Sequence, residues 1–149
     1  MVLPMNSAIR KLLLMLAFGL MWGVARADIY VIVNPSNSLK PLTNKEAVDL
    51  FMGRTRMFPN GDYVLACDLP RDHTVRAGFY QALTGMTPAQ LNSYWSRLMF
   101  TGQVMPPQTV ATEAAVVDMV KRNPGAIGYV GTDPSEKGVR VVMTIKPGN

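Results

Sequence analysis

Cysteine and histidine are nearly absent from this sequence. Its 149 residues include one cysteine, Cys67, and one histidine, His73. A single thiol cannot form an internal disulfide, and a metal site built on several Cys or His ligands cannot be assembled from one of each. Cys67 lies in the apolar run 63–67, which is typical of a small buried hydrophobic residue. We therefore expect no bound metal and no cofactor.

Motifs for catalysis are also missing. The sequence has no HExxH, CxxC or GxSxG motif and no Walker loop for phosphate. It shows no nucleophile–base pair and no paired carboxylates in a catalytic pattern. We therefore expect a binding protein and not an enzyme, with an extracellular hydrolase as the less favoured alternative.

The main uncharged apolar run is too short to span a membrane as a helix. Residues 12–24 form this run of 13 residues, whereas a spanning helix needs about 20. A basic pair at 10–11 precedes it, and an Ala-Arg-Ala motif for signal peptidase ends at Ala27. The pattern predicts that residues 1–27 are a signal peptide, cleaved before Asp28, and that the protein is periplasmic or secreted. An uncleaved anchor is the alternative.

Long basic runs are absent, and the positive charge is concentrated in the leader. The whole chain has 15 Lys and Arg against 10 Asp and Glu. Arg10, Lys11 and Arg26 belong to the leader, so residues 28–149 carry 12 basic against 10 acidic residues, a net charge of +2. Nucleic-acid-binding proteins usually carry a basic stripe, so we expect no nucleic-acid partner. The remaining 122 residues suit one compact domain.

Apolar patterns and capping residues predict alternating strands and helices. Four apolar runs are expected to be strands: 29–33, 63–67, 126–130 and 139–145. Four helices are expected to begin at or near a threonine: Thr43, Thr74, Thr87 and Thr112. This alternation predicts an α/β fold with a mixed sheet flanked by helices.

Several segments, taken in order, resemble one known family. They are residues 33–37, 47–54, 58–61, 71–79, 94–95, 100–102 and 123–130. The most specific are Leu-Phe-Met-Gly-Arg, which ends at Arg54, and Asn-Pro-Gly-Ala-Ile-Gly-Tyr-Val, which ends at Val130. Together they resemble the phosphate-binding substrate-binding proteins of ABC transporters, which have the type II periplasmic-binding fold.

The resemblance covers only one of the two lobes of such proteins, the second. It implies that residues 28–149 are a single-lobe domain that binds phosphate or a similar oxyanion for ABC-type uptake or sensing. The partners it implies are ABC transporter membrane subunits and a second lobe, supplied by another chain or by self-association. The alternative is an envelope protein-interaction module that has lost ligand binding, because a lone lobe provides half of a cleft.

The segment from Arg71 to Arg76 is the candidate anion site. A helix start offers free backbone N–H groups, and hydroxyl and guanidinium groups add donors for phosphate oxygens. By the resemblance, Arg71 and Thr74 take the roles of the family's arginine and of its Ser or Thr, and Arg76 is a third candidate. The family's Ser-Gly-Thr triplet is replaced by His-Thr-Val at 73–75.

These three residues also have plainer explanations. Thr74 could simply cap the helix. Arg71 and Arg76 could be exposed to solvent or paired with Asp68 or Asp72, and exposed pairs of this kind contribute little to stability.

The loop after the first strand supplies two secondary candidates, Ser36 and Asn37. Ligands of α/β folds tend to sit beyond the carboxyl ends of strands, which is where this loop lies. The alternative for both residues is turn formation around Pro35.

Overall fold

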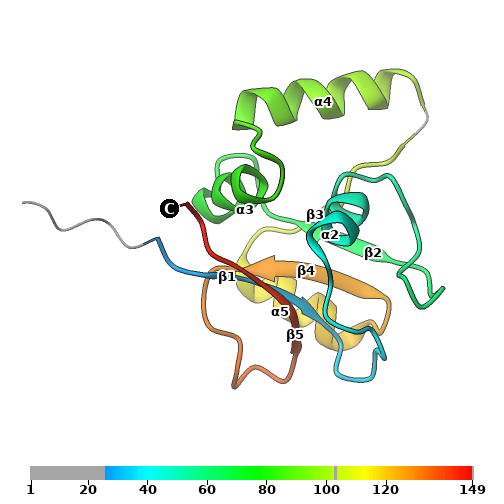
Figure 1. The fold of residues 1–149 in the computed structure, drawn as a ribbon, viewed down its shortest axis with the longest axis vertical. Helices are drawn as coiled ribbons and strands as arrows, with labels where there is room; N and C mark the ends of the chain where they lie inside the picture. The colour runs from blue at the N-terminus through cyan, green and yellow to red at the C-terminus, as the bar shows by residue number, and fades with distance from the viewer. Residues whose placement is uncertain (1–25, 103, 149) are drawn as a thin grey trace, which may run out of the picture.

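The computed structural model describes residues 26–102 and 104–148 (Figure 1). Its strands are β1 (Ile29–Val33), β2 (Leu65–Asp68), β3 (Gln108–Thr109), β4 (Ala126–Val130) and β5 (Arg140–Ile145). Its helices are α2 (Asn44–Phe51), α3 (Thr74–Thr84), α4 (Pro88–Phe100) and α5 (Glu113–Arg122). The expected signal peptide lies outside the described residues, apart from Arg26 and Ala27.

The five strands form one mixed sheet in the order β3-β2-β4-β1-β5. Strands β3, β2 and β4 run parallel to one another, whereas β1 runs antiparallel to both its neighbours, β4 and β5. The carboxyl ends of β3, β2 and β4 therefore lie at one end of the sheet, where β1 begins. The expected α/β class with a mixed sheet is confirmed.

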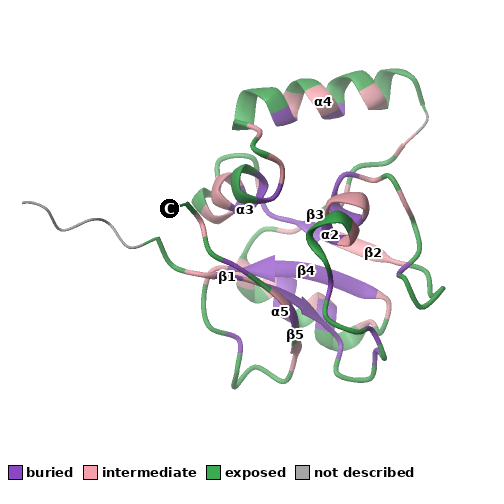
Figure 2. Ribbon diagram, in the orientation of Figure 1, coloured by how far each residue is buried: buried purple, intermediate pink, exposed green. Residues whose placement is uncertain are grey.

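Two neighbouring residues of β4 show how the helices cover the two faces of the sheet. Gly128 lies so close to Val116 of α5 that a Cβ atom here would overlap the valine side chain. Tyr129 points to the opposite face. There it stacks on Phe79 of α3, with 3.8 Å between ring centroids, and meets Phe51 of α2 edge-on. Helix α5 thus covers one face, while α2 and α3 cover the other, and Figure 2 shows the buried strand β4 between them.

Helix α4 lies beyond α3, away from the sheet (Figure 1). Only Leu91 and Trp95 of this helix are buried. The hydroxyl of Tyr94 donates to the Met52 carbonyl at 2.8 Å and ties α4 to the end of α2. Phe100, the last residue of α4, is 95% exposed. None of the helices in the described part of the chain is long and apolar enough to cross a membrane.

Most boundaries match the sequence analysis to within one residue, with two larger differences. Strand β2 begins at Leu65 and not at Tyr63, which is 80% exposed and pairs only with Met57 in an isolated bridge. Strand β3 was not expected, because its two residues are both exposed and show no apolar pattern. It pairs with the end of β2, so tertiary contact and not local sequence defines it.

Cys67 of β2 is fully buried, as expected. Burial, with a smaller effect from the neighbouring Asp68 carboxylate, raises the pKa of its thiol to about 11. A thiol with such a pKa stays protonated at neutral pH and is a poor nucleophile. Within residues 26–102 and 104–148, no group of three Cys, His, Asp or Glu side chains is placed to hold a metal ion.

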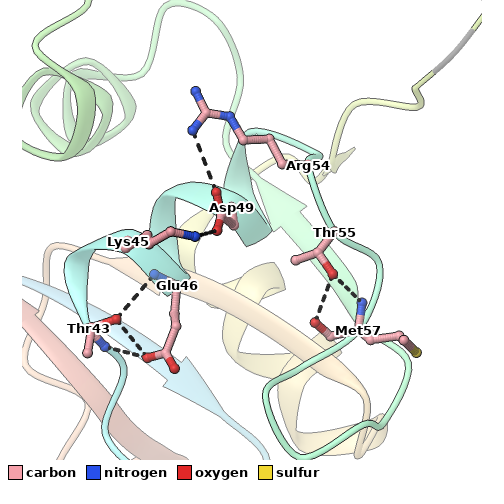
Figure 3. A network of polar contacts seen from close by, with 7 residues as sticks. All are labelled: Thr43, Lys45, Glu46, Asp49, Arg54, Thr55 and Met57. Carbon is pink, nitrogen blue, oxygen red and sulfur yellow. Dashed lines mark hydrogen bonds and ion pairs between the residues drawn. The ribbon is translucent and has the colours of Figure 1, made fainter.

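The start of α2 is held by a capping box, drawn in Figure 3. Thr43 Oγ1 accepts from the Glu46 N–H, and the Thr43 N–H donates to Glu46 Oε2 at 2.8 Å. These backbone and hydroxyl donors of Thr43 lower the pKa of the Glu46 carboxyl. Farther along, the Asp49 carboxylate pairs with Lys45 at 2.6 Å, and this hydrogen bond lowers its pKa. The expected caps at Thr43, Thr87 and Thr112 are all confirmed.

Replacing the cap should therefore destabilise the protein. We expect Thr43→Ala to lower the free energy of unfolding by about 1 kcal/mol, as loss of an N-cap typically does. Because the folded-state pKa of Glu46 is lowered, its carboxylate stabilises the fold at neutral pH, and this stabilisation is lost as the pH falls through that pKa. The difference in unfolding free energy between the unaltered protein and Thr43→Ala should therefore shrink in acid. Urea unfolding at several pH values measures the loss of unfolding free energy and its dependence on pH. Lys45→Ala, which removes an exposed ion pair, is the control, and an equal loss in both variants would contradict the assignment.

Candidate functional site

Helix starts converge at the end of the sheet where the parallel strands finish. Strand β2 ends at Asp68, and α3 begins at Thr74 after a short loop. Strand β3 leads into α5, which begins at Glu113. Gly131 follows β4 and lies between the two: a Cβ atom on it would be 2.8 Å from Val75 Cγ2 and 3.8 Å from Glu113 Oε1. The first turns of α3 and α5 thus border one region.

His73, and not Thr74, caps α3. The Nδ1 atom of His73 accepts from the Val75 N–H at 3.2 Å. The imidazole thereby satisfies one of the backbone N–H groups left without a partner at the start of the helix. The sequence analysis offers capping as the alternative role for Thr74. Thr74 is instead the first helical residue, exposed to solvent, and its hydroxyl makes no hydrogen bond with the part of the chain that is described.

Arg71 and Arg76 have different environments. Arg71 lies in the loop before α3 and is exposed. Arg76 is buried, and its Nε donates to Asp68 Oδ2 at 2.9 Å, with both side chains only 6% exposed. Its guanidinium also lies over the Tyr80 ring, 5.2 Å from the centroid. Of the alternatives left open by the sequence, Arg76 takes the ion pair with Asp68.

The Asp68 carboxylate is the centre of a buried polar cluster. Besides Arg76, it accepts from the Leu69 N–H at 2.9 Å and from the Tyr129 hydroxyl. Burial, and then the Asp68 charge, raise the pKa values of Tyr129 and Tyr80 above their ordinary range, so both phenols stay protonated. The cluster joins the end of β2 to the first turn of α3 and to β4. It therefore fixes the loop that carries Arg71.

Ser36 and Asn37 lie at the opposite end of the sheet. Strand β1 is antiparallel to β4, so the loop after β1 lies near the start of β4 and far from the start of α3. The Ser36 hydroxyl donates to Asn34 Oδ1 at 2.7 Å, and Asn37 Nδ2 donates to the Pro124 carbonyl at 3.0 Å. The structure therefore does not bring these two candidates together with Arg71 and Thr74. The expected grouping fails because β1 and β2 have their carboxyl ends on opposite sides.

An open groove of about 460 Å³ runs along α3 from its exposed start. Thr74, Val75, Gly78 and Gln81 form its helical wall, and Ile29 and Pro147, near the two ends of the described chain, form the other. Exposed hydroxyl and backbone donors at the helix start thus border a solvent-accessible hollow.

Glu113 is a charged residue of this region that the sequence analysis did not single out. It is the first residue of α5, half-buried, and its Oε2 accepts from the Gly131 N–H at 2.8 Å and the Thr132 N–H at 3.1 Å. The bonded groups are 18 and 19 residues apart in sequence. An acidic residue directly after a capping threonine is an ordinary helix start, so the sequence carried no signal for this longer-range contact.

The structure is similar to solved structures of transport proteins. One is an ABC-type phosphate transport receptor from Vibrio cholerae, at TM-score 0.59 and 15% identity over 79% of this chain and 47% of that one. Another, from Clostridium perfringens, is described as a phosphate ABC transporter substrate-binding protein with bound phosphate. Its TM-score is 0.61 and its sequence identity 17%, over 80% of this chain and 46% of that one. A third is PstS from Borrelia burgdorferi, with a TM-score of 0.60 and a sequence identity of 14%, over 78% of this chain and 47% of that one. No family model and no curated protein matches the sequence.

These matches concern the fold, given identities of 14–17%. The fold of phosphate-transporter binding proteins, expected from the sequence resemblance, is confirmed at this level. The chain spans about half the length of the structures it matches, covering 46–47% of each of them.

Two buried tyrosines provide a test of the polar cluster. The Tyr129 hydroxyl donates to Asp68, whereas the Tyr80 hydroxyl, although buried, has no hydrogen-bond partner among the described residues. We expect Tyr129→Phe to cost about 2 kcal/mol of unfolding free energy, because the bond to a charged acceptor is lost. Tyr80→Phe should be close to neutral. Urea unfolding compares the two variants, and equal losses would show that the cluster is not organised by Tyr129.

Proposed function

We propose that this protein is an exported binding domain for phosphate or a similar oxyanion, serving ABC-type uptake or sensing. The observation that carries the proposal is the exposed start of α3 at the carboxyl ends of parallel strands, in a fold similar to that of phosphate-transport binding proteins. A helix start at this place combines free N–H donors with the positive end of the helix dipole. The domain binds its ligand and carries out no reaction.

The donors divide into contacting and positioning groups. The backbone N–H groups of the first turn of α3, the Thr74 hydroxyl and the Arg71 guanidinium contact the anion. Arg76, whose Nε is bound to Asp68, positions the turn through the buried cluster. Ser36 and Asn37 take no part, because their side chains tie the loop after β1 to itself and to Pro124.

The affinity of this domain alone should be modest. It spans about half the length of the proteins it resembles, so it offers one binding face. We propose that a second lobe, from another chain or a second copy, covers the anion, and that the membrane subunits of an ABC transporter receive it. Millimolar phosphate should raise the melting temperature, since a ligand that binds only the folded state stabilises it.

Removing the contacting side chains tests the site. We expect Arg71→Ala combined with Thr74→Ala to abolish the phosphate-dependent rise in melting temperature and the heat of binding in titration calorimetry. Both residues are exposed, so folding should be unaffected. The matched control is Arg97→Ala with Ser93→Ala, which removes one guanidinium and one hydroxyl from the exposed face of α4. Retained binding in the Arg71/Thr74 variant would overturn the assigned site.

A second candidate function, an envelope protein-interaction module, has one observation in its favour. Phe100 is 95% exposed and Met105 is 78% exposed, and they flank the loop after α4. Exposed apolar side chains of this size are typical of protein contacts when they gather in one patch. Absence of binding to phosphate, sulfate and arsenate in the unaltered protein would favour this function over anion capture.

Export has a separate test. If residues 1–27 are a cleaved signal peptide, the protein recovered from the periplasm or medium should begin at Asp28. N-terminal sequencing and intact mass measure this directly. Recovery of the full-length chain in the membrane fraction would instead support the uncleaved anchor.

A further inference from the structure

An acidic side chain of the protein itself already occupies backbone donors next to the proposed anion site. Glu113 Oε2 accepts from two successive backbone N–H groups, those of Gly131 at 2.8 Å and Thr132 at 3.1 Å. Successive N–H groups that converge on one point form the kind of concave site that binds anions in many proteins. Here the bound anion is the Glu113 carboxylate.

This carboxylate lies close to the first turn of α3. A Cβ atom built on Gly131 would be 2.8 Å from Val75 Cγ2 and 3.8 Å from Glu113 Oε1. Val75 is the residue whose N–H is capped by His73, so it marks the start of the helix. The negative charge of Glu113 therefore acts on any anion held at that start.

Arg26 lines the groove along α3 but belongs to the expected leader. The other charges near the start of α3 do not offset Glu113. Asp68 and Arg76 form a closed ion pair, and the exposed Arg71 and Asp72 in the same loop have opposite charges. Glu113 belongs to none of the ion pairs found among the described residues. These groups together leave one negative charge beside a site proposed to bind anions.

We propose that Glu113 determines the affinity and charge selectivity of the anion site. Its carboxylate fills the donors after β4 and repels a ligand at the start of α3, with twice the energy for a dianion as for a monoanion. This inference rests on the proposed function and names its regulation. It predicts that neutralising Glu113 strengthens anion binding, and strengthens it more for doubly charged anions.

Coulomb's law sets the scale of the effect. For a separation of about 8 Å and an effective dielectric constant of about 40, removing one charge improves the affinity for a monoanion roughly sixfold and for a dianion roughly 30-fold. The gain for the dianion is thus the square of the gain for the monoanion. A role of Glu113 that is only structural would produce no such relation.

The experiment compares Glu113→Gln with the unaltered protein by titration calorimetry at pH 7 and low ionic strength. Glutamine keeps an oxygen that can accept from Gly131 and Thr132 but carries no charge. Sulfate serves as the dianion and nitrate as the monoanion, with phosphate measured alongside. The control, Glu136→Gln, removes the same charge from an exposed position. Glu136 lies in the loop whose Gly138 adjoins Lys121, at the other end of α5 from Glu113.

We expect tighter binding to Glu113→Gln, with the larger gain for sulfate, and no change in Glu136→Gln. Glu113→Ala, which also removes the hydrogen bonds, should show a similar gain, whereas a purely structural tie would make it bind more weakly. Binding by the unaltered protein without a gain in either variant would overturn this inference and leave the proposed function intact. If neither the unaltered protein nor either Glu113 variant binds any of the three anions, both this inference and the proposed function would be overturned. Binding by the variants alone would support the inference.

Discussion

The buried carboxylate of Asp68 is the group on which the end of the molecule with the proposed anion site depends. It accepts from the Leu69 N–H, Arg76 Nε and the Tyr129 hydroxyl, and so joins β2, α3 and β4 at one point. A buried charge is tolerated only when it is paired and hydrogen-bonded, and removing one partner of such a pair costs several kcal/mol, about 3 to 5. The geometry of the α3 start therefore depends on groups that never reach the solvent.

The same cluster explains why the arginines near α3 have separate roles. Arg76 lies in the first turn of the helix with its side chain turned inward to Asp68, and the Tyr80 ring lies beside its guanidinium. Arg71 precedes the helix and stays in solvent, where no ion pair engages it among the described residues. Arg76 supports the helix start, and Arg71 is the arginine assigned to the proposed anion site. Sequence position alone does not distinguish them.

Local signals predicted the elements well, and contacts between distant residues escaped prediction. Capping at Thr43, Thr87 and Thr112 depends on groups three residues away, so the sequence predicts these helix starts. The burial of β4 followed from its apolar run. Most of the failures depend on strand direction or long-range pairing. The exception is the cap of α3, where His73 and not Thr74 accepts from the Val75 N–H. The antiparallel course of β1 separates Ser36 from the α3 start, and the contact from Glu113 spans 18 residues.

The course of β1 has a consequence for engineering. Its following loop closes over the far end of α5, where Asn34 Nδ2 donates to the carbonyls of Val120 and Lys121 at 3.0 and 2.9 Å. The proposed anion face lies at the other end of the same sheet. The contacts of Asn34 and the proposed anion face therefore lie at opposite ends of one small domain. Substitutions in the loop after β1 can therefore be designed without changing any residue of the proposed anion face.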